Sequence, residues 1–244
     1  MFPLRDHNPS LRTPFVVYAL IAANVLVFLF TLSLGDDVRA LNALYVNYAL
    51  IPAINDPLTY VTSQFMHGGL LHLGGNMLFL WIFGDNMEDE MGHLPFLAFY
   101  LAGGVVAGIA QTLSAPGSEI PMVGASGAIA AVMGGYLLLF PKARVDVLII
   151  LVIFFRIFPI PAWIVLGAWL ALQTFSGISA PGDAGGVAYW AHVGGFVAGL
   201  VLALPLWQRL GGPGFWKRTA GRPPHAEARY RYSPTSIPNV RRRR

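Results

Sequence analysis

The sequence of 244 residues contains no cysteine. This absence excludes disulfide bonds, cysteine nucleophiles and thiolate metal sites. Charged residues are also scarce, at 11% of the chain, whereas 55% of the residues are hydrophobic. Such a composition leaves too little polar surface to cover a water-soluble globule of this length. The sequence therefore predicts an integral membrane protein.

Several enzyme signatures are missing as well. The sequence has no H-E-x-x-H motif, which argues against a membrane metalloprotease. Neither Gly84-Asp85 nor Gly182-Asp183 stands in the G-x-G-D setting of aspartyl intramembrane proteases. In the run 124–128 (GASGA), Ala128 occupies the place of the last glycine of a G-x-S-x-G nucleophile elbow, and no predicted strand precedes it. An α/β-hydrolase is therefore disfavoured, and we expect neither a metal nor a cofactor.

Long apolar runs are present instead. Six of them approach the roughly 20 residues that a helix needs to cross about 30 Å of hydrocarbon. These runs are 15–34, 70–84, 95–113, 121–141, 160–176 and 187–207. The first run is longer than the apolar region of a signal peptide and no small-x-small cleavage site follows it, so we expect it to remain in the mature protein.

One apolar segment is harder to interpret. Residues 145–157 are apolar but short for a span, and Pro159 and Pro161 interrupt the pattern that follows. The segment is either an interfacial stretch before the fifth span or one of two tight spans. The positive charges favour six spans, because only this count places every lysine and arginine except Arg39 on the cytoplasmic side.

This sorting of charge is a topology signal rather than a sign of nucleic-acid binding, although the net charge is +4. We therefore expect a multi-pass protein with both termini in the cytoplasm, in contact with lipid and without a nucleic-acid partner. The expected location is a bacterial inner membrane. The acidic cluster Asp85, Glu88, Asp89, Glu90 and His93 would then be a solvated cytoplasmic loop rather than a cation site.

Four polar residues share one depth in this topology. Spans two, four and six run in the same direction, and their N-terminal ends carry His72 with Asn76, Ser126, and His192. A single serine or histidine beside glycines usually serves helix packing, but four polar groups at one depth are hard to explain in this way. Polar groups within hydrocarbon are costly and indicate function. Because His72 and Asn76 are four residues apart, both lie on one helix face and can donate to an oxyanion.

Three motifs carry a resemblance to a known family. They are Gly124-Ala125-Ser126-Gly127, Ala191-His192-Val193-Gly194-Gly195 and the run 67–76, HGGLLHLGGN. In this order, over about residues 12–207, they resemble the rhomboid family of intramembrane serine proteases. The resemblance implies an all-α, polytopic bundle of six transmembrane helices that cleaves transmembrane protein substrates in or next to their membrane segments.

The resemblance also implies roles for individual residues. Ser126 and His192 would form a catalytic dyad without an aspartate, and His72, Asn76 and the backbone N–H of Ser126 would bind the oxyanion. His67 would be structural. We expect Gly124, Gly127, Gly195 and Gly199 to let spans four and six approach closely.

The sequence departs from the family pattern at two places. Leu58-Thr59 stands where many members have Trp-Arg, and Ala130 stands where some members have a tyrosine that stacks on the catalytic base. What orients His192 is therefore open. The expected organisation is a short cytoplasmic N-terminus (1–14), a six-span core (15–207) and a basic, disordered cytoplasmic tail (208–244). Two alternatives are a catalytically silent relative that binds transmembrane clients and a small transporter, although no inverted repeat is evident.

Overall fold

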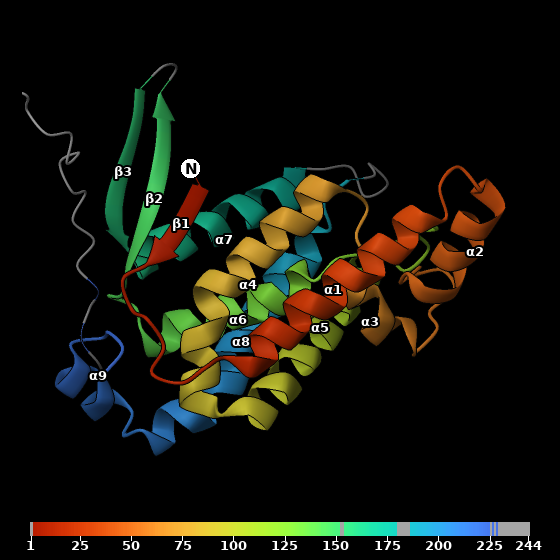
Figure 1. The fold of residues 1–244 in the computed structure, drawn as a ribbon. Coiled ribbons are helices and arrows are strands. Elements are labelled where there is room, and N and C mark those ends of the chain that lie inside the picture. Colours follow the sequence, from red (N-terminus) through yellow and green to blue (C-terminus); the bar gives the residue numbers. More distant parts are fainter. Residues whose placement is uncertain (1, 152–153, 180–185, 225, 227, 229–244) are drawn as a thin grey trace, which may run out of the picture.

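The computed structural model describes residues 2–151, 154–179, 186–224, 226 and 228. One helix corresponds to each of the six predicted spans (Figure 1). These helices are α1 (Phe15–Ser33), α4 (Leu70–Met91), α5 (His93–Ser114), α6 (Ser126–Leu139), α7 (Ala162–Ser179) and α8 (Tyr189–Arg209). By length and composition, α1, α5, α7 and α8 are each suited to cross a membrane.

The other elements lie at the two ends of this bundle (Figure 1). Between α1 and α4, the chain forms α2 (Val38–Tyr48), α3 (Thr59–Thr62) and a 3-10 turn, η1 (Ser63–Phe65). Asp37 caps α2 by accepting hydrogen bonds from two backbone N–H groups. A three-stranded sheet and α9 (Pro213–Thr219) lie at the opposite end.

Helix α6 occupies the centre of the bundle. It contains 14 residues, and at about 1.5 Å per residue it spans about 21 Å, less than the hydrocarbon thickness. It packs against α4, α5 and α8, and most of its side chains are buried. The non-helical backbone that leads into Ser126 lines a cavity within the protein, a setting in which irregular backbone is tolerated at membrane depth.

Backbone contact between α6 and α8 confirms part of the predicted role of the glycines. A Cβ atom at Gly195 would overlap the carbonyl group of Gly127, and one at Gly199 would overlap that of Ala131. Gly127 itself makes room for Ala107 on α5, where a Cβ would come within 2.6 Å of the alanine methyl. Small residues thus allow close helix contact, as they do in other membrane bundles.

Replacing Gly199 by alanine should force α8 away from α6. We expect Gly199→Ala to destabilise the protein by about 1–3 kcal/mol, the usual cost of overpacking. The measurement is the melting temperature in detergent. Gly167→Ala on α7 is the matched control, because nothing lies within 4 Å of the added methyl. Equal melting temperatures for Gly199→Ala and Gly167→Ala would contradict the packing described here.

The three-stranded sheet corrects the interpretation of residues 145–157. Strand β2 (Arg144–Leu151) pairs antiparallel with β3 (Phe154–Pro161) and with β1 (Phe2–Asp6). The alternative of two tight spans is therefore wrong, whereas a single fifth span preceded by a separate segment agrees with the structure, in which that segment is a hairpin followed by α7 (Ala162–Ser179). Branched and aromatic residues favour strands, and Pro159 is tolerated because β3 is an edge strand.

The acidic cluster is helical rather than a solvated loop, and it anchors the N-terminal segment. The Glu88 carboxylate accepts hydrogen bonds from the backbone N–H groups of Val16 and Val17, at the start of α1. Asp89 does the same for Leu11 and Arg12. Negative charge at a helix N-terminus is stabilising. Within the described residues no group of acidic and histidine side chains is arranged to hold a metal ion.

The C-terminal segment folds back onto the core. Phe215 of α9 is buried, and Trp216 Nε1 donates a hydrogen bond to the carbonyl O of Leu138 at 2.9 Å. The backbone N–H of Lys142 also bonds to the carbonyl O of Gly221. The expectation of a disordered tail is therefore wrong for 208–224. The remainder of the tail, with Arg241–Arg244, lies outside the described residues apart from 226 and 228.

A buried carboxyl group links the sheet to the helices. Asp6 Oδ2 lies 2.9 Å from Asn86 Nδ2 and 3.0 Å from the Tyr136 hydroxyl. Burial, reinforced by the nearby Asp85 carboxylate, raises the pKa of Asp6 from 3.8 to about 8. The carboxyl thus keeps its proton in the folded protein at pH values where the unfolded chain has lost it.

Asp6 should therefore make stability fall as pH rises. Between about pH 4 and 8 the folded state holds one more proton than the unfolded state, so the free energy of unfolding decreases with increasing pH. We expect melting temperatures measured from pH 5 to 8 to fall less steeply in Asp6→Asn than in the wild type. Asp36→Asn, the same change at an exposed carboxyl, is the control. Parallel wild-type and Asp6→Asn curves would contradict this assignment.

Candidate active site

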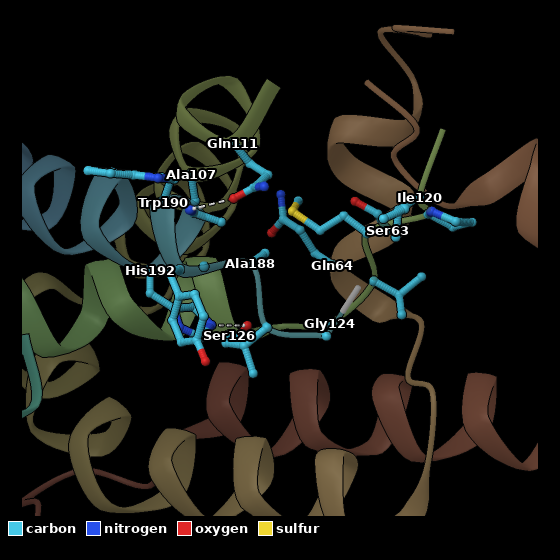
Figure 2. A pocket seen from close by; sticks show the side chains of 18 of the residues that line it. Ser63, Gln64, Ala107, Gln111, Ile120, Gly124, Ser126, Ala188, Trp190 and His192 are labelled. Atoms are coloured by element: carbon cyan, nitrogen blue, oxygen red, sulfur yellow. Dashed lines mark hydrogen bonds between the residues drawn. The ribbon is translucent and has the colours of Figure 1, made fainter. Parts of the chain in front are cut away.

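The structure brings Ser126 and His192 into hydrogen-bond contact. Ser126 is the first residue of α6 and His192 is the fourth residue of α8. The Oγ of Ser126 lies 2.8 Å from Nε2 of His192, as the dashed line in Figure 2 shows. Ser126 is half-buried and His192 is buried. Two residues separated by 66 positions, which the sequence suggests as nucleophile and base, thus lie in direct contact.

A residue that sequence reasoning missed lies on the other side of the imidazole ring. Gln173 on α7 is buried, and its Oε1 is 2.8 Å from Nδ1 of His192. One turn earlier on the same helix, the ring of Trp169 lies 5.6 Å from the histidine ring, centroid to centroid, at 37°. These two residues of α7 therefore contact the His192 ring, whose orientation the sequence leaves open.

His72 lies against the backbone just before Ser126. Gly124 has a φ of +127°, and a Cβ at this position would come within 2.7 Å of His72 Nε2. Glycine is therefore required at position 124 both by its backbone conformation and by the imidazole that lies against it. The backbone N–H of Gly124 donates to the carbonyl O of Ser63, which fixes this loop to η1.

Asn76 is buried one helical turn beyond His72, and its Nδ2 donates to Nε2 of His67 at 2.9 Å. The rings of His67 and His72 are 5.1 Å apart in an edge-to-face arrangement. His67 precedes α4, which begins at Leu70. Its direction is therefore not set by the helix that carries the other two residues. It contacts Asn76 directly and is part of the site.

These residues border a cavity of about 590 Å³, which Ser126, His192, His72 and Asn76 all line. Figure 2 shows that Gln64 and Gln111 project toward the same space. The Oε1 of Gln111 accepts a hydrogen bond from the backbone N–H of Ala191. A cavity of this size, mainly apolar with a few convergent polar groups, is typical of a binding site.

Sequence reasoning found the four chemically active candidates but missed three glutamines. Gln64 and Gln111 lie in the pocket, and Gln173 lies behind the base. Gln111 and Gln173 lie within predicted spans, which is a signal in itself, because an unpaired amide in hydrocarbon is costly. Such a signal indicates that the side chain forms a hydrogen bond, but it does not identify the residue to which it bonds.

Comparisons with known proteins agree with this arrangement. Residues 55–209 match the model of the Rhomboid domain family. The chain is 30% identical over 195 residues to "Rhomboid protein 1, mitochondrial" of Saccharomyces cerevisiae, covering 76% of this chain and 51% of the relative. It is 29% identical over 192 residues to "Presenilin-associated rhomboid-like protein, mitochondrial" of Homo sapiens, covering 75% and 46%. The chain thus spans about half the length of these curated relatives.

A shorter match extends the set of relatives. The chain is 38% identical over 93 residues to "Rhomboid-like protein 11, chloroplastic" of Arabidopsis thaliana, covering 38% of this chain and 31% of the relative. The names of these relatives refer to mitochondria and chloroplasts, so they give no support to the predicted bacterial membrane. The comparisons and the helices support a multi-pass integral membrane protein. The match of residues 55–209 to the Rhomboid domain family, together with these relatives, shows that the chain belongs to the rhomboid family.

Proposed function

We propose that the chain is an intramembrane serine endopeptidase, which hydrolyses peptide bonds in or next to the transmembrane segments of membrane proteins. The observation that carries this proposal is the 2.8 Å contact between Ser126 Oγ and His192 Nε2 at the edge of the cavity. Family membership supports the same reaction. The test is cleavage of single-span substrates by the purified protein in detergent, with Ser126→Ala as the control.

In the proposed reaction, His192 Nε2 accepts the Ser126 proton while Oγ attacks the carbonyl carbon of the scissile bond. The resulting tetrahedral intermediate collapses, and the imidazolium gives its proton to the leaving amine. An acyl ester on Ser126 remains. Water, activated by the same histidine, then hydrolyses the ester and returns Ser126 to its initial state.

The oxyanion would be bound beside Ser126. The first N–H groups of α6 have no partner within the helix, and the positive end of the helix dipole favours negative charge there. His72 and Asn76 border the same cavity. The hydrogen bond from Asn76 to His67 fixes the amide orientation and leaves its second N–H available to the oxyanion.

We also propose that both termini lie on the cytoplasmic side. Strand β1 near the N-terminus pairs with β2, and the backbone N–H of Ala228 donates to the carbonyl O of His7. Both ends of the described chain therefore lie at one end of the bundle, as an even number of spans requires. The excess of lysine and arginine at this end supports its cytoplasmic placement.

The dyad gives the first functional prediction. Ser126→Ala and His192→Ala should each abolish cleavage, and the double variant should be no worse than either single variant, because the pair acts as a unit. Cleavage rates and melting temperatures of all three variants check this expectation. Substantial cleavage by a clean, folded Ser126→Ala preparation would overturn the assignment of the nucleophile.

The oxyanion groups give a graded prediction. Asn76→Ala and His72→Ala should each lower kcat by about 10²-fold, the lower end of the range for one lost oxyanion donor, and should raise KM less. His67→Ala should cause a smaller loss, because it frees the orientation of Asn76 without removing the amide. Asn47→Ala is the control, since this amide bonds only its own helix, at the carbonyl O of Ala43. Wild-type kcat in Asn76→Ala would contradict the proposed site.

A further inference from the structure

The contact between Gln173 and His192 has a definite consequence for the proton on the imidazole ring. Gln173 Oε1 faces Nδ1 of His192 at 2.8 Å, and an amide oxygen can only accept a hydrogen bond. The proton of neutral His192 therefore resides on Nδ1. Nε2 is then unprotonated and can accept the hydroxyl proton of Ser126, 2.8 Å away.

We propose that Gln173 is a positioning residue, which holds His192 as the Nδ1–H tautomer with Nε2 directed at Ser126. This inference rests on the proposed function, because tautomer and orientation matter to a general base. Gln173 acts only through His192 and touches no reacting atom. Its place corresponds to that of the aspartate in a Ser-His-Asp triad, but the group is a neutral amide.

Trp169 completes the support from α7. Residues 169 and 173 are four apart and so share one face of the helix, and this face packs on α8. The Trp169 ring is 5.6 Å from the His192 ring and 6.2 Å from that of Phe196. An aromatic face at this distance attracts a cation. Trp169 therefore stabilises the imidazolium that forms after proton transfer. Gln173 is neutral and supplies no negative charge to balance this cation.

A neutral acceptor suits this environment. Gln173 is 9% exposed and lies on a helix of 18 mainly apolar residues. A carboxylate there would carry a large desolvation penalty while His192 is neutral. A glutamine fixes the same tautomer without that penalty. The neutral amide of Gln173 is thus sufficient to orient the base, and no acidic residue is needed.

The kinetic test compares three variants on α7. Gln173→Leu removes the acceptor and leaves a buried N–H unpaired, so kcat should fall roughly 10- to 100-fold with KM near the wild-type value. Gln173→Glu keeps an acceptor oxygen in place, and in its neutral, protonated form it avoids the desolvation penalty of a carboxylate, so it should restore most of the lost kcat. Thr174→Val, which removes only a hydrogen bond to the carbonyl O of Leu170 on the same helix, should match the wild type. Equal losses in Gln173→Leu and Gln173→Glu would overturn the proposal.

A spectroscopic test does not depend on activity. With ¹⁵N-labelled histidine and the protein in lipid, the His192 signals are those that disappear in His192→Ala. The proposal expects a protonated Nδ1 in the wild type and loss of this preference in Gln173→Leu. A proton on Nε2 in the wild type would overturn it. If the expected tautomer is seen but the wild type cleaves no substrate, the proposed protease function fails and the positioning role stands.

Discussion

The hydrogen bond between Ser126 and His192 depends on close backbone contact between two helices. The serine side chain is short, so α6 and α8 must lie close together for Oγ to reach the histidine ring. Gly195 and Gly199 permit this approach, since a Cβ at either position would overlap a carbonyl group of α6. In a membrane, where lipid is as apolar as the helices, such packing is a main source of helix association. The same contacts therefore stabilise the fold and set the geometry of the site.

Several polar groups of the site are matched to a protein partner. His192 is bound on both sides by Ser126 and Gln173, and Asn76 is bound to His67. Gln64 donates to the carbonyl O atoms of Tyr60 and Leu101. An unpaired polar group away from water is costly, so these pairs make a polar cluster tolerable inside an apolar bundle. They also limit the orientations that each side chain can adopt.

A second polar layer lies at the other end of the bundle. There Glu88 and Asp89 cap the N-terminal segment, and Asp6 joins β1 to α4 and α6. The two layers have different purposes. The first surrounds an open cavity next to a serine hydroxyl, whereas the second ties the N-terminal strand to the helices. Between them the buried side chains are mainly apolar.

The sequence predicts the helical bundle well, because the length of an apolar run and the spacing of polar residues are local properties. It also predicts that His72, Asn76, Ser126 and His192 meet, since equal depth follows from the direction of the spans. The pairing of β1 escapes prediction because β1 and β2 are about 140 residues apart. Pairing between them depends on the folded bundle.

Gln173 escapes prediction for a related reason. Helix α7 is apolar on every side, so its pattern does not reveal which face meets α8. The contacts of His67 are also not predictable from helical spacing, because this residue precedes α4. Both cases concern the rotation and ends of helices, which tertiary packing decides.

The most direct test is to find which residue reacts with a fluorophosphonate, a reagent that phosphonylates activated serines with loss of fluoride. After exposure of the purified protein, peptide mapping by mass spectrometry identifies the modified side chain. We expect a single adduct on Ser126 that is lost when His192 is replaced by alanine. An unmodified Ser126 in the folded wild-type protein, or an adduct that forms equally well without His192, would contradict this expectation.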